Sequence, residues 1–325
     1  MLVHHSPYCD FITYTSSVTP GLSLAARIIK PERPSCILVE THGWHLSIPE
    51  HTVMNEPDPD NTYLRVQVDM RGRAHSTGNP DCNGLELFDV IDAVQYARTH
   101  YSEYLLDPEI VYFESESGGG GNALALAGKF PDFFAAITSL CGISDYAQWY
   151  EQDKLGEFRD EMDVWIGCSP TDNIMAYQSR SGLYVLPNLM TPLYMAHGET
   201  DERISIAHAR NYVARAKQLK KDHLITYDEL KGVGTRDHWG NATSEQLASM
   251  KENSEKNRKA NRKPITLPRS GRLVIAGYVV TKQFGIYLDS IDKTAVVDYD
   301  LDKHSFKVSS SVACDYRIER FDQAN

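Results

Sequence analysis

The sequence predicts an α/β fold: a doubly wound, mostly parallel sheet with a partial lid insertion and a small C-terminal β appendage. Short apolar strands alternate with helix-length segments up to about residue 250, which is typical of βαβ units. The alternation is interrupted over residues 142–190, where an insertion would cover the strand ends. Past residue 264, closely spaced strand patterns follow one another without helices between them.

The strands expected in the parallel sheet are short runs rich in apolar, β-branched and aromatic residues. They cover residues 35–40, 63–69, 110–113, 133–140, 192–196 and 224–227. Helices are expected over residues 85–100 and 204–219, the first because its apolar residues recur at helical spacing. Such sheets bind their ligands at the carboxyl ends of the strands, so the loops after these strands are where chemistry is expected.

The chain is expected to divide into a catalytic domain over residues 1–250, a linker over 251–264 and a β-rich appendage over 265–325. The linker region is polar and basic, without apolar periodicity, which is equally typical of a solvated helix. Within the appendage, residues 300–303 supply a hairpin loop between two strand patterns. The appendage carries no chemical motif, so packing, docking and contact within a homo-oligomer all remain open for it.

Composition and charge exclude several classes of partner. The formal net charge of −11 argues against nucleic acid or an anionic membrane as the main partner. No apolar run reaches the roughly 18 residues of a membrane span, and the first residues do not form a secretory signal. The six cysteines are scattered without a CxxC pair, which indicates reduced thiols and a cytoplasmic setting. The histidines show no ligand spacing, and neither a metal nor a cofactor is expected.

The most informative stretch is Glu116-Ser117-Gly118, where a β-prone run turns sharply into a glycine-rich, Ala/Leu helical segment. A serine at such a corner exposes its hydroxyl above the sheet, and the N–H of the next residue points toward a developing oxyanion. We therefore predict Ser117 as a nucleophile and the Gly118 N–H as an oxyanion donor. Ser115 stands where such corners usually carry glycine, and an ordinary glycine-rich turn is the alternative.

A serine hydroxyl needs a histidine to take its proton and a carboxylate to fix the tautomer of that histidine. Asp201 and His238 each follow a predicted strand, and one helix and one further strand separate them. We predict these two residues as the acid and the base. Glu199 and Asp237 compete for the acidic position. Glu199 lies too early in its loop, and Asp237 is adjacent to the histidine and poorly placed to orient it.

The second oxyanion donor is expected to be the N–H of Trp44, because Gly43 lets the chain turn sharply after an early strand. The insertion carries Tyr146, Trp149 and Trp165, which we predict as substrate-binding residues able to stack on sugar, acyl or aryl groups. Each of these aromatic residues is also compatible with an ordinary role in the core.

Taken together, these motifs resemble the α/β-hydrolases of the prolyl oligopeptidase-like and acetyl-esterase-like branch. The resemblance runs from Pro31 to about Trp239. It is carried by His42-Gly43, the run from Asp69 to Gly78, the serine elbow, Ser169-Pro170, the run from Gly198 to Asp201, and His238. The resemblance implies an α/β-hydrolase fold and serine-dependent acyl transfer, but it does not fix the substrate, because the branch contains both peptidases and esterases.

The activity expected from these residues is cleavage of a carboxylic ester through an acyl-enzyme, on a small-molecule or carbohydrate ester. Peptidases of this branch usually carry a large N-terminal propeller, whereas only residues 1–34 precede the first predicted strand of the parallel sheet. This difference favours the ester. A serine peptidase or amidase is the alternative, and a catalytically silent binding or structural module is the second alternative.

Overall fold

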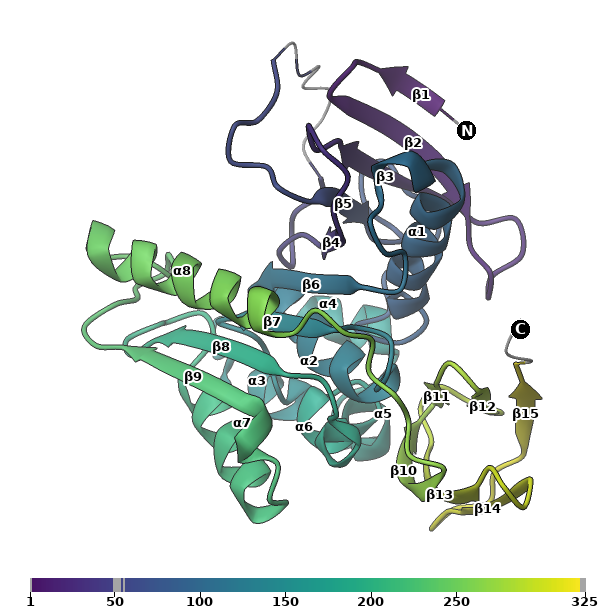
Figure 1. The fold of residues 1–325 in the computed structure, drawn as a ribbon. Helices are drawn as coiled ribbons and strands as arrows, with labels where there is room; N and C mark the ends of the chain where they lie inside the picture. Colours follow the sequence, from purple (N-terminus) through teal and green to yellow (C-terminus); the bar gives the residue numbers. More distant parts are fainter. Residues whose placement is uncertain (1, 49–53, 55, 322–325) are drawn as a thin grey trace.

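The structure, a computed structural model, describes residues 2–48, 54 and 56–321 and contains two sheets (Figure 1). The larger sheet has nine strands in the order β1-β2-β3-β5-β4-β6-β7-β8-β9. Its strands are β1 (Leu2–His5), β2 (Cys9–Thr15), β3 (Ser23–Ile29), β4 (Ile37–Glu40), β5 (Leu64–Asp69), β6 (Val111–Glu116), β7 (Ala136–Leu140), β8 (Leu193–Gly198) and β9 (Ile225–Leu230). From β5 to β9 all neighbours are parallel, so the expected α/β fold is confirmed.

Three antiparallel strands, β1 to β3, extend the sheet at one edge and were not expected from the sequence. Asp10 is buried near the start of β2, where its carboxylate accepts hydrogen bonds from Lys30 Nζ at 2.9 Å and from the Tyr101 hydroxyl at 2.7 Å. This pairing satisfies the buried charge. The rest of β2, residues 11–15, is β-prone, but no helices separate β1 to β3, so these strands lack the alternation with helices from which the parallel strands were predicted.

Helices cover both faces of the nine-stranded sheet. The described helices are α1 (Leu87–His100), α2 (Gly118–Lys129), α3 (Tyr146–Gln152), α4 (Arg159–Ile166), α5 (Ile174–Gln178), α6 (Gly182–Val185), α7 (Ala207–Gln218) and α8 (Ser244–Ala260), with short 3₁₀ turns η1 (Ser102–Tyr104), η2 (Leu186–Asn188) and η3 (Asp222–Leu224). The largest apolar cluster joins α1, α2 and α7 to one face, whereas α8 crosses the opposite face (Figure 1). The insertion after β7 forms α3 to α6.

Residues 251–260, where the sequence left a linker or a solvated helix open, continue α8. This helix begins with a capping box formed by Thr243 and Gln246. Its inner face is polar: Ser254 bonds the Thr138 hydroxyl at 2.7 Å, and buried Arg258 pairs with Glu114 on β6. Because polar contacts rather than an apolar stripe hold the helix on the sheet, its sequence lacks apolar periodicity.

The six-stranded sheet is antiparallel and lies beyond α8 in the sequence. Its strands, in the order β14-β13-β10-β11-β12-β15, are β10 (Ser270–Ala276), β11 (Tyr278–Val280), β12 (Phe284–Leu288), β13 (Thr294–Asp300), β14 (Ser305–Ser309) and β15 (Tyr316–Arg320). The hairpin at residues 300–303 joins β13 to β14, whereas β15 had no predicted counterpart. The domain boundaries and a homo-oligomer through this sheet stay predictions.

Side chains at the interface fix the six-stranded sheet to the rest of the molecule. Tyr278 packs on Phe88 with ring centroids 4.6 Å apart, and its hydroxyl donates to the Gly84 carbonyl at 2.7 Å. The Asn188 side chain bonds both the carbonyl and the N–H of Val274, at 2.8 and 2.7 Å. These buried, satisfied contacts indicate that the sheet is packed against α1 and the loop before it, rather than hanging from a tether.

The buried Lys129 makes the stability of this interface depend on pH. It ends α2, donates from Nζ to the Asn83 carbonyl at 3.1 Å and lies 4.4 Å from the ring centroid of Tyr278. Burial lowers the pKa of Lys129 from its ordinary value of 10.5 to about 7. Between these two values the unfolded chain binds the proton and the folded chain does not, so folding becomes more favourable as the pH rises.

We therefore expect wild-type protein to gain stability relative to Lys129→Met as the pH rises from about 7 toward 10.5. The expected gain is about 1.4 kcal/mol per pH unit. Urea unfolding of both proteins over a pH series measures it, and Lys217→Met, which removes an exposed lysine on α7, is the control. A difference between wild type and Lys129→Met that does not change with pH would contradict the assignment.

Candidate active site

Ser117 occupies the corner between β6 and α2. Its backbone has φ 58° and ψ −123°, in the left-handed half of the map that side chains other than glycine rarely adopt. Small neighbours allow this corner, because a Cβ on Gly119 would lie 2.7 Å from Ser115 Cβ, and one on Gly120 would lie 2.5 Å from the Leu140 carbonyl oxygen. The strained turn holds the Ser117 side chain at the carboxyl end of β6.

Ser115, the unusual residue of the corner, has a structural role that the sequence did not reveal. Its hydroxyl accepts a hydrogen bond from the N–H of Thr41 at 2.7 Å and donates to the Thr41 carbonyl at 2.9 Å. Thr41 directly precedes the His42-Gly43-Trp44 loop. The Ser115 hydroxyl therefore holds the loop after β4 against β6, the strand that leads into Ser117. A glycine at position 115 could not form these hydrogen bonds.

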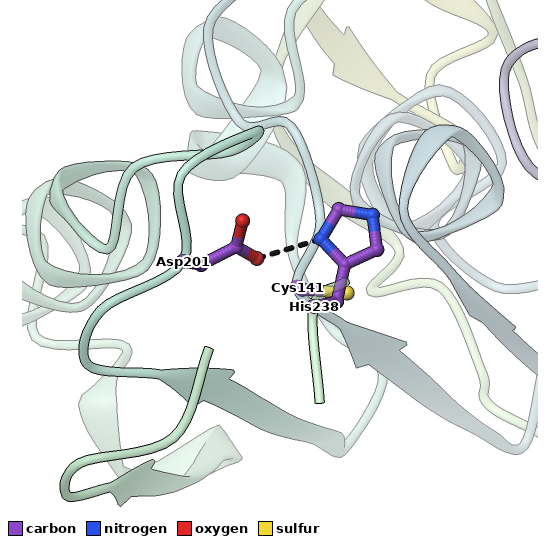
Figure 2. Close-up of side chains that lie close together, drawn as sticks. All are labelled: Cys141, Asp201 and His238. Atoms are coloured by element: carbon purple, nitrogen blue, oxygen red, sulfur yellow. Dashed lines mark hydrogen bonds and ion pairs between the residues drawn. The ribbon is translucent and has the colours of Figure 1, made fainter. Parts of the chain in front are cut away.

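The structure brings Ser117, His238 and Asp201 together at the carboxyl ends of β6, β9 and β8. His238 Nε2 lies 2.9 Å from Ser117 Oγ, and His238 Nδ1 lies 2.7 Å from Asp201 Oδ2. Figure 2 shows the imidazole and the carboxylate facing each other. With the proton on Nδ1, His238 donates to Asp201 and leaves Nε2 free to accept the proton of the serine hydroxyl.

Backbone contacts orient the Asp201 side chain, which is fully buried. Its second oxygen accepts the N–H groups of Arg203 and Ile204 at 2.9 and 3.0 Å. The competing carboxylates have other partners: Glu199 accepts from the N–H of Gly232 at 3.0 Å, and Asp237 accepts from the N–H of the residue two positions on. Asp201 is thus the carboxylate that contacts the imidazole.

The backbone of Trp44 lies against Gly118, the residue that follows Ser117. A Cβ on Gly118 would lie 2.8 Å from Trp44 N, so only glycine allows this approach. Among the residues that the structure describes, neither the N–H of Trp44 nor that of Gly118 has an acceptor. Two adjacent free donors beside a nucleophile are what an oxyanion hole requires, and their role in catalysis remains part of the proposal below.

His42 and Glu161 fix the loop that carries Trp44. His42 Nδ1 donates to the Gly43 carbonyl at 2.9 Å, and its Nε2 accepts the N–H of Met70 at 3.1 Å. Burial lowers the pKa of His42, which favours this neutral, twice-bonded form. From α4, the Glu161 carboxylate accepts the indole N–H of Trp44 at 2.5 Å. The contacts with Met70 and Glu161 connect the loop at residues 42–44 to elements that are distant in sequence.

The three aromatic residues predicted to bind substrate surround the Trp44 side chain. Trp149 and Trp165 place their ring centroids 4.8 Å from that of Trp44, and Tyr146 lies at 6.0 Å. Tyr146 and Trp149 are buried, the latter donating its indole N–H to the Arg203 carbonyl. The structure thus places these two behind Trp44 as packing support, whereas Trp165 is partly exposed. Direct contact of any of them with substrate stays a prediction.

Cys141 lies beside the histidine and the carboxylate and was not expected at the site (Figure 2). One ligand atom from each of Cys141, Asp201 and His238 lies within 4.8 Å of the others, and this donor set would suit zinc. Burial, with the charge of Asp201, raises the pKa of Cys141 well above its ordinary range, so the thiol keeps its proton. In the structure His238 already bonds both Asp201 and Ser117.

Arg73 is a second residue at the site to which the sequence analysis gave no role, although it lies in the run from Asp69 to Gly78. Its guanidinium carbon lies 4.6 Å from the ring centroid of Trp165, and both residues line a small cavity with Trp44 and Gly118. No local pattern could have found this contact, because the two side chains come from separate elements far apart in sequence.

None of the described helices is long and apolar enough to cross a membrane.

The sequence profile of the prolyl oligopeptidase family matches residues 57–252, more than half of the chain. Among curated proteins, the uncharacterized peptidase YtmA of Bacillus subtilis is 26% identical over 151 residues, which cover 46% of this chain and 57% of that protein. Dipeptidyl peptidase family member 6 of Caenorhabditis elegans is 27% identical over 221 residues, which cover 62% of this chain and 29% of that protein. The chain therefore spans only part of the length of these relatives.

Solved structures share the fold. The acylaminoacyl peptidase of Pyrococcus horikoshii superposes with a TM-score of 0.58 at 19% identity, covering 81% of this chain and 42% of that one. A puromycin hydrolase superposes with a TM-score of 0.60 at 12% identity, covering 81% of this chain and 40% of that one. At these identities the likeness concerns the fold alone.

The comparisons contradict the expectation of a carboxylic-ester hydrolase acting on a small-molecule or carbohydrate ester, and they favour the peptidase alternative, because the matching family and both curated relatives carry the names of peptidases. The error has a physical reason. A serine, histidine and aspartate form acyl-enzymes from esters and amides alike, so these residues could not discriminate between the two, and the short stretch before the parallel strands was a poor guide. The chain belongs to the prolyl oligopeptidase family.

Proposed function

We propose that the chain is a serine peptidase or amidase that cleaves a peptide-like bond through an acyl-enzyme on Ser117. The observation that carries this proposal is the line of hydrogen bonds from the Ser117 hydroxyl through His238 to Asp201. Family membership and the names of the curated relatives favour an amide over an ester as the bond cleaved.

In this mechanism His238 Nε2 takes the hydroxyl proton while Ser117 Oγ attacks the carbonyl carbon of the substrate. The N–H groups of Trp44 and Gly118 hold the resulting oxyanion. His238 then gives the proton to the leaving amine as the C–N bond breaks, and afterwards activates a water that hydrolyses the acyl-enzyme. Asp201 stabilises the imidazolium in both halves of the reaction.

We keep a cytoplasmic setting as part of the proposal. All six cysteines are free thiols, and four of them are buried. Thiols that stay reduced are typical of proteins in a reducing compartment. Mass spectrometry of the six thiols after alkylation of intact cells tests this setting, and disulfides within the native protein would contradict it.

Removing the nucleophile tests the proposed reaction directly. Wild-type protein should react with a fluorophosphonate at Ser117, whereas Ser117→Ala should not, and kcat on a peptide anilide should fall by about 10⁴-fold or more. Asp201→Asn should lower kcat strongly as well, because the imidazole loses the partner that fixes its tautomer. Ser309→Ala, at an exposed position on β14, is the matched control. Folded wild-type protein that takes no label would instead favour a silent binding module.

A substrate panel tests the choice of amide over ester. We expect turnover of peptide anilides well above the spontaneous rate and no release of acetyl or feruloyl groups from sugars. Activated esters such as p-nitrophenyl acetate should also react, because the acyl-enzyme forms from them readily. Chromatography of the reaction products identifies the bond cleaved. If Ser117 takes the fluorophosphonate but every peptide in the panel stays intact, the peptidase proposal fails.

Weakening the contact between Glu161 and Trp44 should lower turnover while Ser117, His238 and Asp201 stay unchanged. In Glu161→Gln the charge-assisted hydrogen bond from the indole N–H of Trp44 weakens. The loop is then held less firmly, so the backbone N–H of Trp44 loses part of its orientation. We expect kcat to fall on the order of 10-fold with little change in KM, since the donor acts on the transition state. Asp160→Asn, one residue earlier and exposed, is the control. Equal kcat in both variants would show that the loop does not depend on Glu161.

A further inference from the structure

Arg73 lies in the loop after β5, at the small cavity beside the two free N–H groups. Its guanidinium stacks on Trp165, and Trp44, Gly118 and Glu86 line the same cavity. An arginine stacked on an aromatic ring keeps its plane fixed while the N–H groups at its edge stay available. Such an arginine can hold a carboxylate through two parallel hydrogen bonds.

The Arg73 guanidinium forms no ion pair or hydrogen bond with the residues that the structure describes, and its Nε is buried without an acceptor. The charge of Glu86 acts on it without such a contact. Arg71, two residues earlier, shows the usual arrangement: it contacts the buried Asp89 through Nε at 3.1 Å and Nη2 at 2.5 Å. A buried N–H of a charged group without a partner is costly, so the contrast between the two arginines points to a ligand for Arg73.

Glu86 is the carboxylate that lines the cavity with Arg73, but its oxygens already have other partners. They accept the N–H groups of Asn83 at 2.7 Å and Asp81 at 3.3 Å. Burial and the neighbouring Asp81 raise the pKa of Glu86 against the opposing charge of Arg73, so Glu86 carries a negative charge less readily than an exposed glutamate. Glu86 therefore shapes the loop under the cavity and leaves the guanidinium of Arg73 open.

We propose that Arg73 binds a carboxylate of the substrate and so selects peptide-like substrates that carry an acidic group next to the bond cleaved. The inference rests on the proposed peptidase function and adds its substrate class. The free N–H groups of Trp44 and Gly118 would hold the carbonyl oxygen under attack. Because Trp44 and Gly118 line the same cavity as Arg73, we expect the carboxylate to lie close to that carbonyl.

The size of the cavity restricts the group further. Its volume is about 20 Å³, room for about one water molecule. A space of this size excludes a large side chain, so we expect the shorter side chain of aspartate to be preferred over that of glutamate. A free C-terminal carboxylate just beyond the bond cleaved could bind Arg73 in the same way. The experiment below therefore tests the side-chain carboxylate and the C-terminal carboxylate separately.

The first arm compares N-acetylated peptide anilides that end in Ala-Asp, Ala-Glu or Ala-Asn. Aspartate and asparagine have nearly the same shape and differ in charge. We expect wild-type kcat/KM to be at least about 10-fold higher for Asp than for Asn, with most of the difference in KM, as is typical of a charge-assisted contact. Arg73→Met should abolish the ratio and Arg73→Lys should restore part of it. Arg269→Met, an exposed arginine paired with Asp302, should keep it.

The second arm compares a peptide with a free C-terminal carboxylate and the same peptide as its amide. A preference for the charged substrate in either arm that Arg73→Met removes supports the proposal and identifies the source of the carboxylate. Equal kcat/KM for charged and neutral substrates in both arms overturns it. A preference that persists in Arg73→Met overturns it as well. Thermal unfolding of each variant establishes that the protein tested is folded.

A third measurement separates this inference from the proposed function. N-acetyl-aspartate should slow fluorophosphonate labelling of Ser117 in wild-type protein, and N-acetyl-asparagine should not. Arg73→Met should lose this protection. The readout needs no peptide cleavage, so protection that depends on Arg73 supports the carboxylate site even where every peptide stays intact. Absence of protection by N-acetyl-aspartate at saturating concentration overturns it.

Discussion

The backbone corner at Ser117 is the constraint on which the rest of the site depends. A serine with φ 58° is held only where its surroundings determine the turn. Here the surroundings are the end of β6, the start of α2 and the glycines that let α2 approach its neighbours. The same corner brings the N–H of Gly118 against Trp44, so one turn positions both the hydroxyl and the donors beside it.

Parallel strand order explains how residues far apart in the sequence meet at this corner. The strands β6, β7, β8 and β9 are consecutive neighbours, and all four point the same way. Their carboxyl ends therefore share one edge of the sheet, where Ser117, Asp201 and His238 lie. Local contacts then set the details: the Asp201 carboxylate accepts two backbone N–H groups of its own loop, and this fixes the oxygen that faces His238.

Local pattern predicted the fold and the strand-end residues, because a parallel α/β fold repeats a simple rule at every strand. Features set by tertiary contacts escaped prediction. Strands β1 to β3 lack the alternation with helices that indicated the parallel strands, and the polar contacts of Arg258 left the face of α8 that packs on the sheet without an apolar pattern. The stacking of Arg73 on Trp165 joins two elements that share no motif. The sequence also could not discriminate between esters and amides as substrates, because a serine, a histidine and an aspartate can act on both.

The six-stranded sheet contacts the loop at residues 81–86, and this loop lines the cavity through Cys82 and Glu86. Tyr278 of that sheet bonds the Gly84 carbonyl, and Lys129 bonds the carbonyl of Asn83, whose side chain in turn bonds the Gly121 carbonyl. Glu86 follows in the same loop. A substitution in the six-stranded sheet can therefore displace the loop that lines the cavity without altering any residue that contacts Ser117, His238 or Asp201, so the cavity and the line of hydrogen bonds beside it can change independently.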